Sequence, residues 1–242
     1  MRQSRIYTSQ VLLTADSVEL EEPASHYLTR VLRLSEGDSL VLFNGDGSDY
    51  SAEVSGITKK HVLVRLLGSK KPGNESPLKI TLVQAICRGE RMDYVLQKAT
   101  ELGVHSIQPL KSHRIEVRLD ETRQAKRMKH WQGVVISACE QSGRARVPEV
   151  KTPLSLAEWV TSTVKSPGLM LDPVAEKRLS DVSVTLDSIS ILVGPEGGFT
   201  DEEISSARAN DVMPVSLGPR ILRTETAGPA AIAVLQAKNG GF

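Results

Sequence analysis

Segments typical of strands alternate with segments typical of helices from Lys79 to the end of the chain, and this alternation limits the possible folds most. KITLVQAI, which begins at Lys79, is a continuous apolar run typical of a buried strand. Apolar residues from Met92 to Leu102 then recur at helical spacing, and Gly103 stands where a helix C-cap belongs. The same order continues, with expected strands at 106–110, 168–172, 189–193 and around Val215, and expected helices after Asp120, over 156–164, from Thr200 and over 230–237. This pattern predicts a mainly parallel α/β sheet.

The first 70 residues have a different pattern, which is typical of a small β-rich unit. Apolar or alternating runs predict strands over 39–44, 50–58 and 61–67. The turn Asn44 to Gly47 supplies residues that tolerate positive φ. One helix is expected between the strands, with Pro23 in its first turn and Tyr27, Val31 and Leu34 along one side.

The polar segment KKPGNESP separates these two patterns. It contains two prolines and a glycine, and it has no periodicity. Such composition is typical of a boundary between domains. We therefore expect a β-rich domain over 1–70, a linker over 71–78 and an α/β domain over 79–242.

Composition excludes several classes of protein. A hydrophobic fraction of 40% is too high for a disordered chain, and the longest apolar runs fall far short of the ~18 to 20 residues of a membrane span. The N-terminus shows no signal peptide, so we expect a cytoplasmic protein. No metal is expected, because two cysteines cannot make a metal site by themselves and the histidines lack ligand spacing. Those histidines are His26, His61, His105, His113 and His130.

Charge is distributed unevenly although the net charge is only +1. Residues 79–151 hold 14 basic and 8 acidic groups, a net of +6, whereas residues 152–242 hold 7 and 11, a net of −4. The basic middle segment would attract a polyanion. A solvated helix face explains the same charges equally well.

A glycine-rich loop, GPEGG, lies between the expected strand 189–193 and the helix from Thr200. Thr200 and Glu203 have the spacing of a capping box, which fixes the start of that helix. Ligands of open α/β sheets bind beyond the carboxyl ends of strands. The loop is neither G-x-G-x-x-G nor a P-loop, which argues against a nucleoside triphosphate.

Two further strand ends carry similar loops. VSLGPRILRTETA, from Val215 to Ala227, runs from a strand through Gly218-Pro219 into a helix, and a third strand end lies at 169–173. Gly228-Pro229 is tolerated only near the start of the last helix. Three such strand ends side by side predict a pocket.

These loops resemble the paired C-terminal signature of a bacterial family that methylates N3 of a uridine in 16S ribosomal RNA of the small subunit. Other segments of the chain agree with this similarity, which extends over nearly the whole length: HYLTRVLRL, RGERMDYVLQKATELGV and CEQSGRARVPEV. The resemblance implies a PUA-like N-terminal β-barrel followed by a SPOUT-type α/β methyltransferase domain with a C-terminal trefoil knot, acting as a homodimer. Gly228-Pro229 departs from the family, which tends to have helix formers there.

The resemblance also implies S-adenosylmethionine as the cofactor, held largely by backbone groups of the three loops. The residues expected to bind it are Leu171, Asp172, Pro173, Val193, Gly194, Pro195, Glu196, Gly197, Gly198, Leu217, Gly218, Ile221, Leu222, Thr226 and Ala227. For catalysis we assign Arg223 and Glu225 to the uracil edge, and Arg220 to the negative charge that develops on the base. A favourable interaction of Glu225 with the helix dipole is the alternative for that residue.

The expected RNA contacts are arginines in both domains: Arg5, Arg30, Arg33, Arg88 and Arg144, with Arg91 and Arg146 as further candidates. Each of them fits an ordinary surface arginine as well. The expected substrate is an assembled small ribosomal subunit. Two other readings remain open: a non-catalytic RNA-binding assembly factor, and an enzyme that uses the pocket for a different nucleotide.

Overall fold

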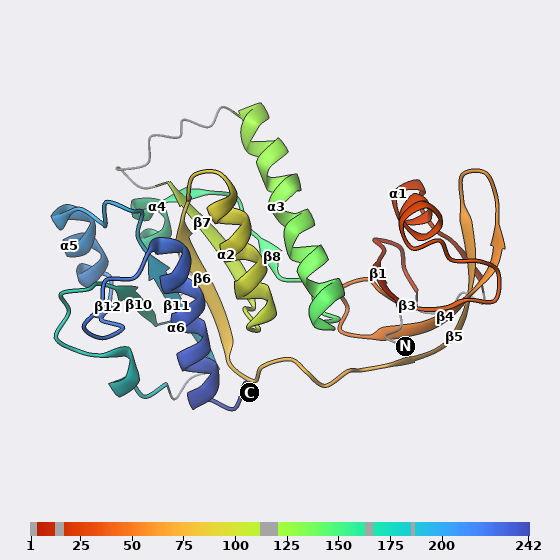
Figure 1. Cartoon of the computed structure of the whole chain (residues 1–242). Coiled ribbons are helices and arrows are strands. Elements are labelled where there is room, and N and C mark those ends of the chain that lie inside the picture. The colour runs from red at the N-terminus through yellow and green to blue at the C-terminus, as the bar shows by residue number, and fades with distance from the viewer. Residues whose placement is uncertain (1–3, 13–16, 112–120, 163–166, 185–186) are drawn as a thin grey trace. The chain divides into compact units, whose positions relative to one another are not determined.

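The computed structural model describes residues 4–12, 17–111, 121–162, 167–184 and 187–242 (Figure 1). The chain divides into two compact units. Unit 1 comprises residues 1–74 together with Cys139–Val147, and unit 2 comprises residues 75–138 and 148–242. Of the sequence predictions, Asp120, His113 and the last residues of the helix expected over 156–164 lie outside the described residues.

Unit 1 is built on a five-stranded sheet in the order β1-β3-β4-β5-β2. The strands are β1 (Ser4–Tyr7), β2 (Ser17–Glu19), β3 (Ser39–Phe43), β4 (Asp49–Ile57) and β5 (Val62–Lys70). The pairing of β1 with β3 is parallel, and the other pairings are antiparallel. Residues such as Leu40, Leu42 and Ala52 are fully buried in the core of this unit. The three predicted strands are confirmed, whereas short β1 and β2 had no recognised pattern.

The predicted helix of unit 1 is present, but its buried side differs from the prediction. Helix α1 (Glu22–His26) has Pro23 in its first turn and continues as one π-helical turn, Tyr27–Val31. Leu28 is the buried residue of that turn, while Tyr27 and Val31 are exposed. Leu28 therefore makes the core contact of this turn, and Leu34, beyond the turn, packs partly against the same core.

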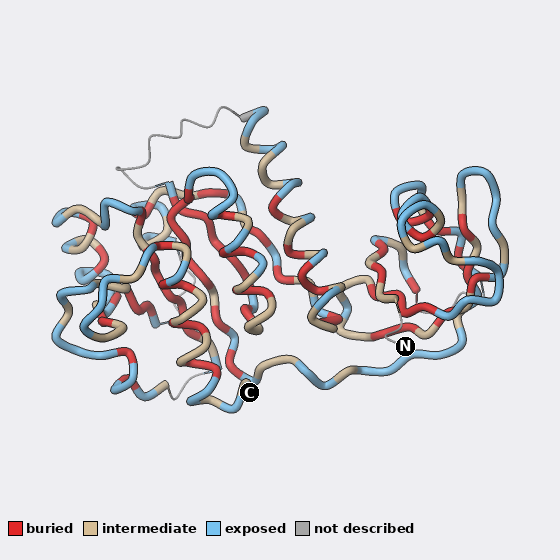
Figure 2. Tube along the Cα trace, in the orientation of Figure 1, coloured by how far each residue is buried: buried red, intermediate tan, exposed pale blue. Residues whose placement is uncertain are grey.

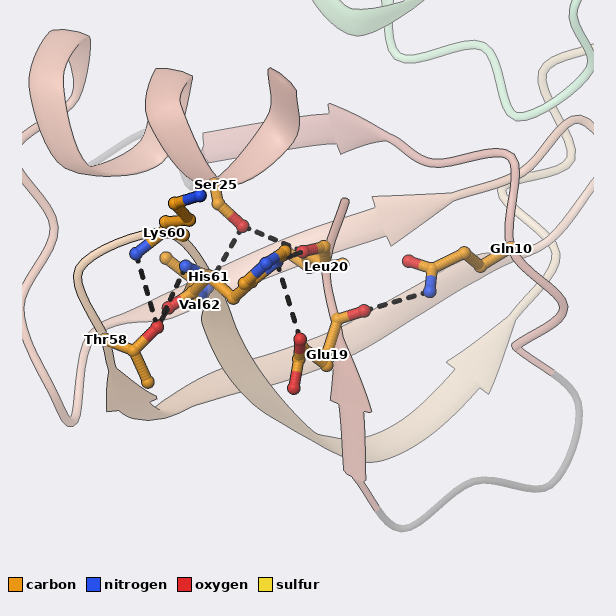
Figure 3. Close-up of polar contacts among 8 residues, drawn as sticks. All are labelled: Gln10, Glu19, Leu20, Ser25, Thr58, Lys60, His61 and Val62. Carbon is orange, nitrogen blue, oxygen red and sulfur yellow. Dashed lines mark hydrogen bonds and ion pairs between the residues drawn. The ribbon is translucent and has the colours of Figure 1, made fainter. Parts of the chain in front are cut away.

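A polar network joins α1 to the neighbouring strands (Figure 3). The Ser25 hydroxyl donates to the Leu20 carbonyl at 2.9 Å, and the Val62 amide donates to the Ser25 hydroxyl oxygen at 3.0 Å. His61 Nδ1 lies 3.2 Å from the Leu20 carbonyl oxygen. These contacts are partly or fully buried, and they fix the position of the helix that leads to Arg30 and Arg33.

Unit 2 contains a seven-stranded, wholly parallel sheet, which confirms the predicted α/β class. Its strands are β6 (Lys79–Ala85), β7 (Ser106–Lys111), β8 (Glu149–Val150), β9 (Leu154–Ser155), β10 (Gly168–Leu171), β11 (Ser188–Val193) and β12 (Val212–Val215). The order is β12-β10-β11-β6-β7-β8, and β9 also pairs with β7. Strands β12, β10 and β11 are therefore neighbours, and their carboxyl ends meet at one edge.

Helices cover both faces of this sheet (Figure 1). They are α2 (Glu90–Glu101), α3 (Glu121–Ser142), α4 (Leu156–Thr161), α5 (Asp201–Ala209) and α6 (Thr224–Lys238), with a short 3₁₀ turn over Leu179–Asp181. Val83 belongs to the cluster packed by α4 and α5, whereas its neighbours Leu82 and Gln84 face α6 on the opposite side. The central strands β6, β7, β10 and β11 are mostly buried (Figure 2). Within the described residues, no helix has the length and apolar composition needed to cross a membrane.

The last helix begins six residues earlier than predicted, at Thr224, and this corrects the expected start at residue 230. Pro229 therefore lies inside α6. Since proline has no N–H, the Glu225 carbonyl loses its usual helical donor. The sequence rule for proline placed the boundary too late, because packing of Thr224, Ala227 and Gly228 on the sheet outweighs that penalty.

The start of α5 confirms the predicted capping box and leads to a stability prediction. The Glu203 amide donates to Thr200 Oγ1 at 3.1 Å, and Glu203 Oε2 accepts from the Thr200 amide at 2.9 Å. Replacing Thr200 by Ala should lower the free energy of unfolding by about 0.5–2 kcal/mol, because the helix loses a cap. Thr200→Ser should lose much less. Urea denaturation measures both, and equal losses for Ala and Ser would contradict the cap.

Candidate cofactor cavity

A cavity of about 470 Å³ lies in unit 2 at the carboxyl ends of β10, β11 and β12. It is formed by the residues after these three strands and by the start of α6. The parallel register explains this convergence, since Leu171 pairs with Val215 and Met170 with Leu192. Three loops that are far apart in the sequence thus share one cavity.

The structure brings most of the predicted site residues together there. All predicted cofactor residues line the cavity except Gly197 and Thr226, and the three predicted catalytic residues Arg220, Arg223 and Glu225 line it too. The lining also includes Thr224, which lies inside the predicted loop Leu217–Ala227, and residues that the sequence did not single out for this site: Arg91, Met170, Phe199, Ile204 and Val215.

Glycines in two loops are required by the backbone. A Cβ at Gly194 would lie 3.1 Å from the Phe199 ring, so a side chain there would displace the ring that packs beneath the loop. Gly218 has φ of +110° and Gly198 has φ of +70°, which L-amino acids with side chains rarely adopt. The Gly198 amide donates to the Pro195 carbonyl at 2.9 Å, which closes a tight turn. These loops therefore present backbone where larger residues would fill the space.

Charged side chains at the cavity wall meet around Arg91, which comes from the first turn of α2. Its Nη1 donates to Glu196 Oε1 at 2.8 Å, and its Nε lies 3.9 Å from Glu225 Oε1. The Glu225 side chain is 15% exposed, and its Oε2 is buried with no hydrogen-bond partner among the described residues. One carboxylate oxygen of Glu225 is thus held near a cation, and the other is enclosed without a hydrogen-bond partner among the described residues. Arg220 and Arg223 are exposed at the same wall.

A buried polar chain lies beneath the cavity, and sequence analysis missed it. Thr224 Oγ1 donates to the Gly194 carbonyl at 2.6 Å, and Gln84 Nε2 donates to Thr224 Oγ1 at 3.2 Å. The only sequence signal was a polar residue, Gln84, inside the apolar run of β6. Nearby, burial raises the pKa of the Cys87 thiol to about 11, so this cysteine is a neutral core residue at pH 7.

The predicted RNA-binding arginines fall into two groups. Arg30 and Arg33 in unit 1 and Arg88 in unit 2 are exposed. Arg5, in contrast, pairs with Asp49 at 2.5 Å and has a side chain that is only 12% exposed. Arg144 is 5% exposed. We therefore leave Arg5 and Arg144 out of the RNA contacts proposed below.

The cavity suits S-adenosylmethionine by several measures. Its volume falls in the ~300–1,000 Å³ range of small-molecule sites. Half-buried Leu217 and Leu222 offer apolar walls to an adenine ring. Acidic Asp172, Glu196 and Glu225 and the nearby arginines match a ligand that carries a sulfonium cation and an amino-acid group. Over the described parts of the chain, no group of three or more His, Cys, Asp and Glu side chains could hold a metal ion.

Comparison with known proteins agrees with this geometry. Residues 74–236 match the RNA methyltransferase domain family, and residues 20–67 match the RNA methyltransferase PUA domain family. The protein thus combines a PUA domain with a SPOUT-type α/β methyltransferase domain.

Relatives that align with nearly the whole chain identify the family within this class of methyltransferases. Ribosomal RNA small subunit methyltransferase E of Buchnera aphidicola (from Schizaphis graminum) is 35% identical over 237 residues, which cover 98% of this chain and 96% of the relative. The enzyme of the same name from Neisseria gonorrhoeae, solved with S-adenosyl methionine, is 40% identical with a TM-score of 0.92, covering 98% of both chains. A methyltransferase of Legionella pneumophila, solved with the bound cofactor, is 42% identical with a TM-score of 0.94, also covering 98% of both chains. The chain belongs to the ribosomal RNA small subunit methyltransferase E family.

Proposed function

We propose that the protein transfers a methyl group from S-adenosylmethionine to N3 of one uridine in the 16S ribosomal RNA of the small subunit. Membership of the family makes it an S-adenosylmethionine-dependent ribosomal RNA methyltransferase. The choice of uridine N3, the homodimer, the trefoil knot and the assembled subunit as substrate are parts of the proposal. A cytoplasmic location is part of the proposal too, because ribosomal RNA is the proposed substrate.

The observation that carries the proposal is the cavity at the joined ends of β10, β11 and β12. In this proposal the three loops hold the cofactor through their backbone, and the glycines of two of them, Gly194, Gly198 and Gly218, support it by leaving that backbone uncovered. The cofactor supplies a methyl group that its sulfonium sulfur already activates. The protein's own tasks are therefore to orient the uracil and to remove its imide proton.

Glu225 and the two exposed arginines divide these tasks. The Glu225 carboxylate, which lines the cavity and has one oxygen without a hydrogen-bond partner among the described residues, accepts the proton from N3. Arg223 lies at the N-cap of α6 and binds the uracil edge, and Arg220 stabilises the negative charge that develops on the base. Positioning of this kind lowers a barrier by roughly 7–11 kcal/mol, whereas a base contributes ~10²- to 10⁴-fold in rate. Orientation by the loops therefore supplies the larger share.

RNA contacts outside the cavity are assigned to Arg30, Arg33 and Arg88. Arg30 lies on the π turn Tyr27–Val31, and such turns are frequent at functional sites. Arg33 has φ of +55°, a conformation that is unfavourable for a residue with a Cβ. The surrounding fold maintains this conformation at an exposed arginine, which supports a role in binding phosphate.

The direct test is methyl transfer from labelled S-adenosylmethionine to small ribosomal subunits from cells that lack the gene. The product nucleoside is identified by mass spectrometry. N3-methyluridine at a single position is the expected result. Transfer to a different base would contradict the proposed specificity, and cofactor binding without transfer would point to another RNA. A protein that shows neither would be the RNA-binding assembly factor.

Salt dependence tests the arginine contacts. With one phosphate contacted by each of the three proposed arginines, log affinity should fall with log salt at a slope near −2, since each contact in single-stranded RNA adds about −0.7. Arg33→Gln should make the slope about 0.7 less steep, because one released counterion is lost. Arg65→Gln is the control, since Arg65 is also exposed to solvent but already pairs with Glu53 at 2.9 Å. Filter binding over a salt series measures both, and equal slopes for Arg33→Gln and the unmodified protein would exclude the contact.

A further inference from the structure

We propose that Gln84 and Thr224 are positioning residues for the cofactor cavity: the buried amide of Gln84 fixes the Thr224 hydroxyl, which joins the glycine-rich loop to the first turn of α6. This inference rests on the proposed function, because it concerns the same cavity. It assigns a task to two side chains that are almost completely enclosed by protein.

Thr224 links two walls of the cavity. It is the first residue of α6 and is only 6% exposed. Its Oγ1 donates to the carbonyl oxygen of Gly194, the first residue of the loop after β11, at 2.6 Å. Both residues line the cavity, although 30 positions separate them in the sequence. This single bond therefore sets the spacing between the glycine-rich loop and the helix that carries Glu225.

Gln84 decides which way the hydroxyl points. It is fully buried, and its Nε2 donates to Thr224 Oγ1 at 3.2 Å and to the Ala85 carbonyl at 3.1 Å. A flipped amide would put its oxygen against the Ala85 carbonyl oxygen, which can only accept, so this orientation is the favourable one. Because Gln84 donates to the hydroxyl oxygen, the single Thr224 proton is left for Gly194.

The position of the amide oxygen of Gln84 accounts for the glycine at position 228 in α6. Gln84 Oε1 is buried and has no hydrogen-bond partner among the described residues. It lies against Gly228, where an added Cβ would be 3.1 Å from Oε1 and 3.3 Å from a Leu82 methyl group. A side chain at 228 would therefore push Gln84 away from Thr224. The Gly228-Pro229 pair, which weakens the helix, leaves room for the amide.

The unsatisfied oxygen indicates that stability does not explain Gln84. A buried acceptor without a donor is unfavourable, and an apolar side chain of similar size would avoid that cost. Gln108, in the adjacent strand β7, makes the contrast clear. Its Nε2 also donates to the next carbonyl, at 3.0 Å to Pro109, but its second bond, at 2.8 Å to the Thr152 carbonyl, serves only the framework. The two buried glutamines thus have similar settings and different partners.

The test compares matched substitutions in the full chain. Thr224→Val and Gln84→Met remove the two bonds with little change in volume, and Thr224→Ser retains the hydroxyl. The controls are Gln108→Met and Thr100→Val, since Thr100 is fully buried and donates to the Leu96 carbonyl at 2.7 Å inside α2. Calorimetric titration gives the dissociation constant of S-adenosylhomocysteine. Hydrogen exchange of residues 194–198 in ligand-free protein gives a second readout that is independent of activity.

We expect Thr224→Val and Gln84→Met each to weaken binding at least about tenfold. Both should speed exchange in the loop, and Thr224→Ser should restore most of the affinity. The controls should lower the melting temperature without changing affinity or loop exchange. Normal affinity and normal loop exchange in both test variants would overturn the inference, as would equal losses in the controls. If the unmodified protein bound no S-adenosylhomocysteine, the proposed function would fail, and loop exchange would still decide the role of this bond.

Discussion

Replacing Glu225 by Gln should lower kcat by about 10²- to 10⁴-fold, because the variant cannot take the proton from uracil N3. The carboxylate oxygen Oε2 is buried at the cavity and has no hydrogen-bond partner among the described residues, whereas Oε1 lies 3.9 Å from Arg91. The amide of Gln has nearly the same shape, so the cavity should be preserved. Rates are measured on small subunits at saturating cofactor, and the affinity for S-adenosylhomocysteine should change by less than about threefold.

The alternative role for Glu225 is a favourable interaction with the α6 dipole. A second acidic residue at a helix start serves as a control that distinguishes this role from that of a catalytic base. Asp201 is exposed in the first turn of α5 and does not line the cavity. Asp201→Asn should therefore cost stability of about 0.3–1 kcal/mol and leave turnover unchanged. If Glu225→Gln showed the same stability loss and normal turnover, the base role would be excluded.

Replacing Arg5 by Met should destabilise unit 1 by about 3–5 kcal/mol, because Asp49 would be left as a buried, uncompensated charge. Arg5 Nη1 pairs with Asp49 Oδ2 at 2.5 Å, with side-chain exposures of 12% and 7%. The guanidinium also donates to the Arg144 carbonyl at 3.1 Å and lies 5.0 Å from the centre of the Phe43 ring. Asp49→Leu should be similarly costly, and the double substitution should recover part of the loss, since it removes both charges.

The measurement has to report on unit 1. Both tryptophans, Trp131 and Trp159, belong to unit 2, so their fluorescence does not follow this unit. Hydrogen exchange of the backbone amides of β3 and β4, measured in the full chain, does report on the stability of unit 1. Arg65→Met is the matched control, because its ion pair with Glu53 joins strands of the same sheet at the surface, where such pairs contribute ~0–1 kcal/mol. If Arg5→Met left β3 and β4 as protected as this control, the structural role of Arg5 would be wrong.

Much of the fold followed from patterns that depend on neighbours in the sequence. The apolar run of β6, the helical spacing of α2 with Gly103 at φ +83° after its end, and the capping box at Thr200 are all local features. The glycine-rich loops could be placed because the strands before them were clear. Parallel strands bring their carboxyl ends together, so the sequence also predicted where a cavity should form.

Other features depend on contacts that local patterns do not show. Arg5 looks like any basic residue near an N-terminus, and only the position of Asp49, 44 residues later, makes it a buried partner. Gln84 was hidden inside an apolar strand, since its role depends on Thr224, 140 residues later. The π turn at Tyr27–Val31 contains no proline or glycine, so the local sequence carried no signal that the helix type changes there.

The segment Cys139–Val147 has a consequence for how the chain is made. It belongs to unit 1, where the Tyr7 amide donates to Glu140 at 3.0 Å and the Gly47 amide donates to the Ala145 carbonyl at 3.2 Å. During translation, Asn74 is followed by 73 residues (147 − 74) before this segment is complete. At a synthesis rate of about 5–20 residues per second, roughly 4 to 15 s pass between synthesis of the N-terminal sheet and synthesis of the segment that completes unit 1. The first domain to leave the ribosome therefore cannot complete its fold until residues 75–138 of the second have been synthesised, and a nascent chain stalled near residue 100 would carry it incomplete.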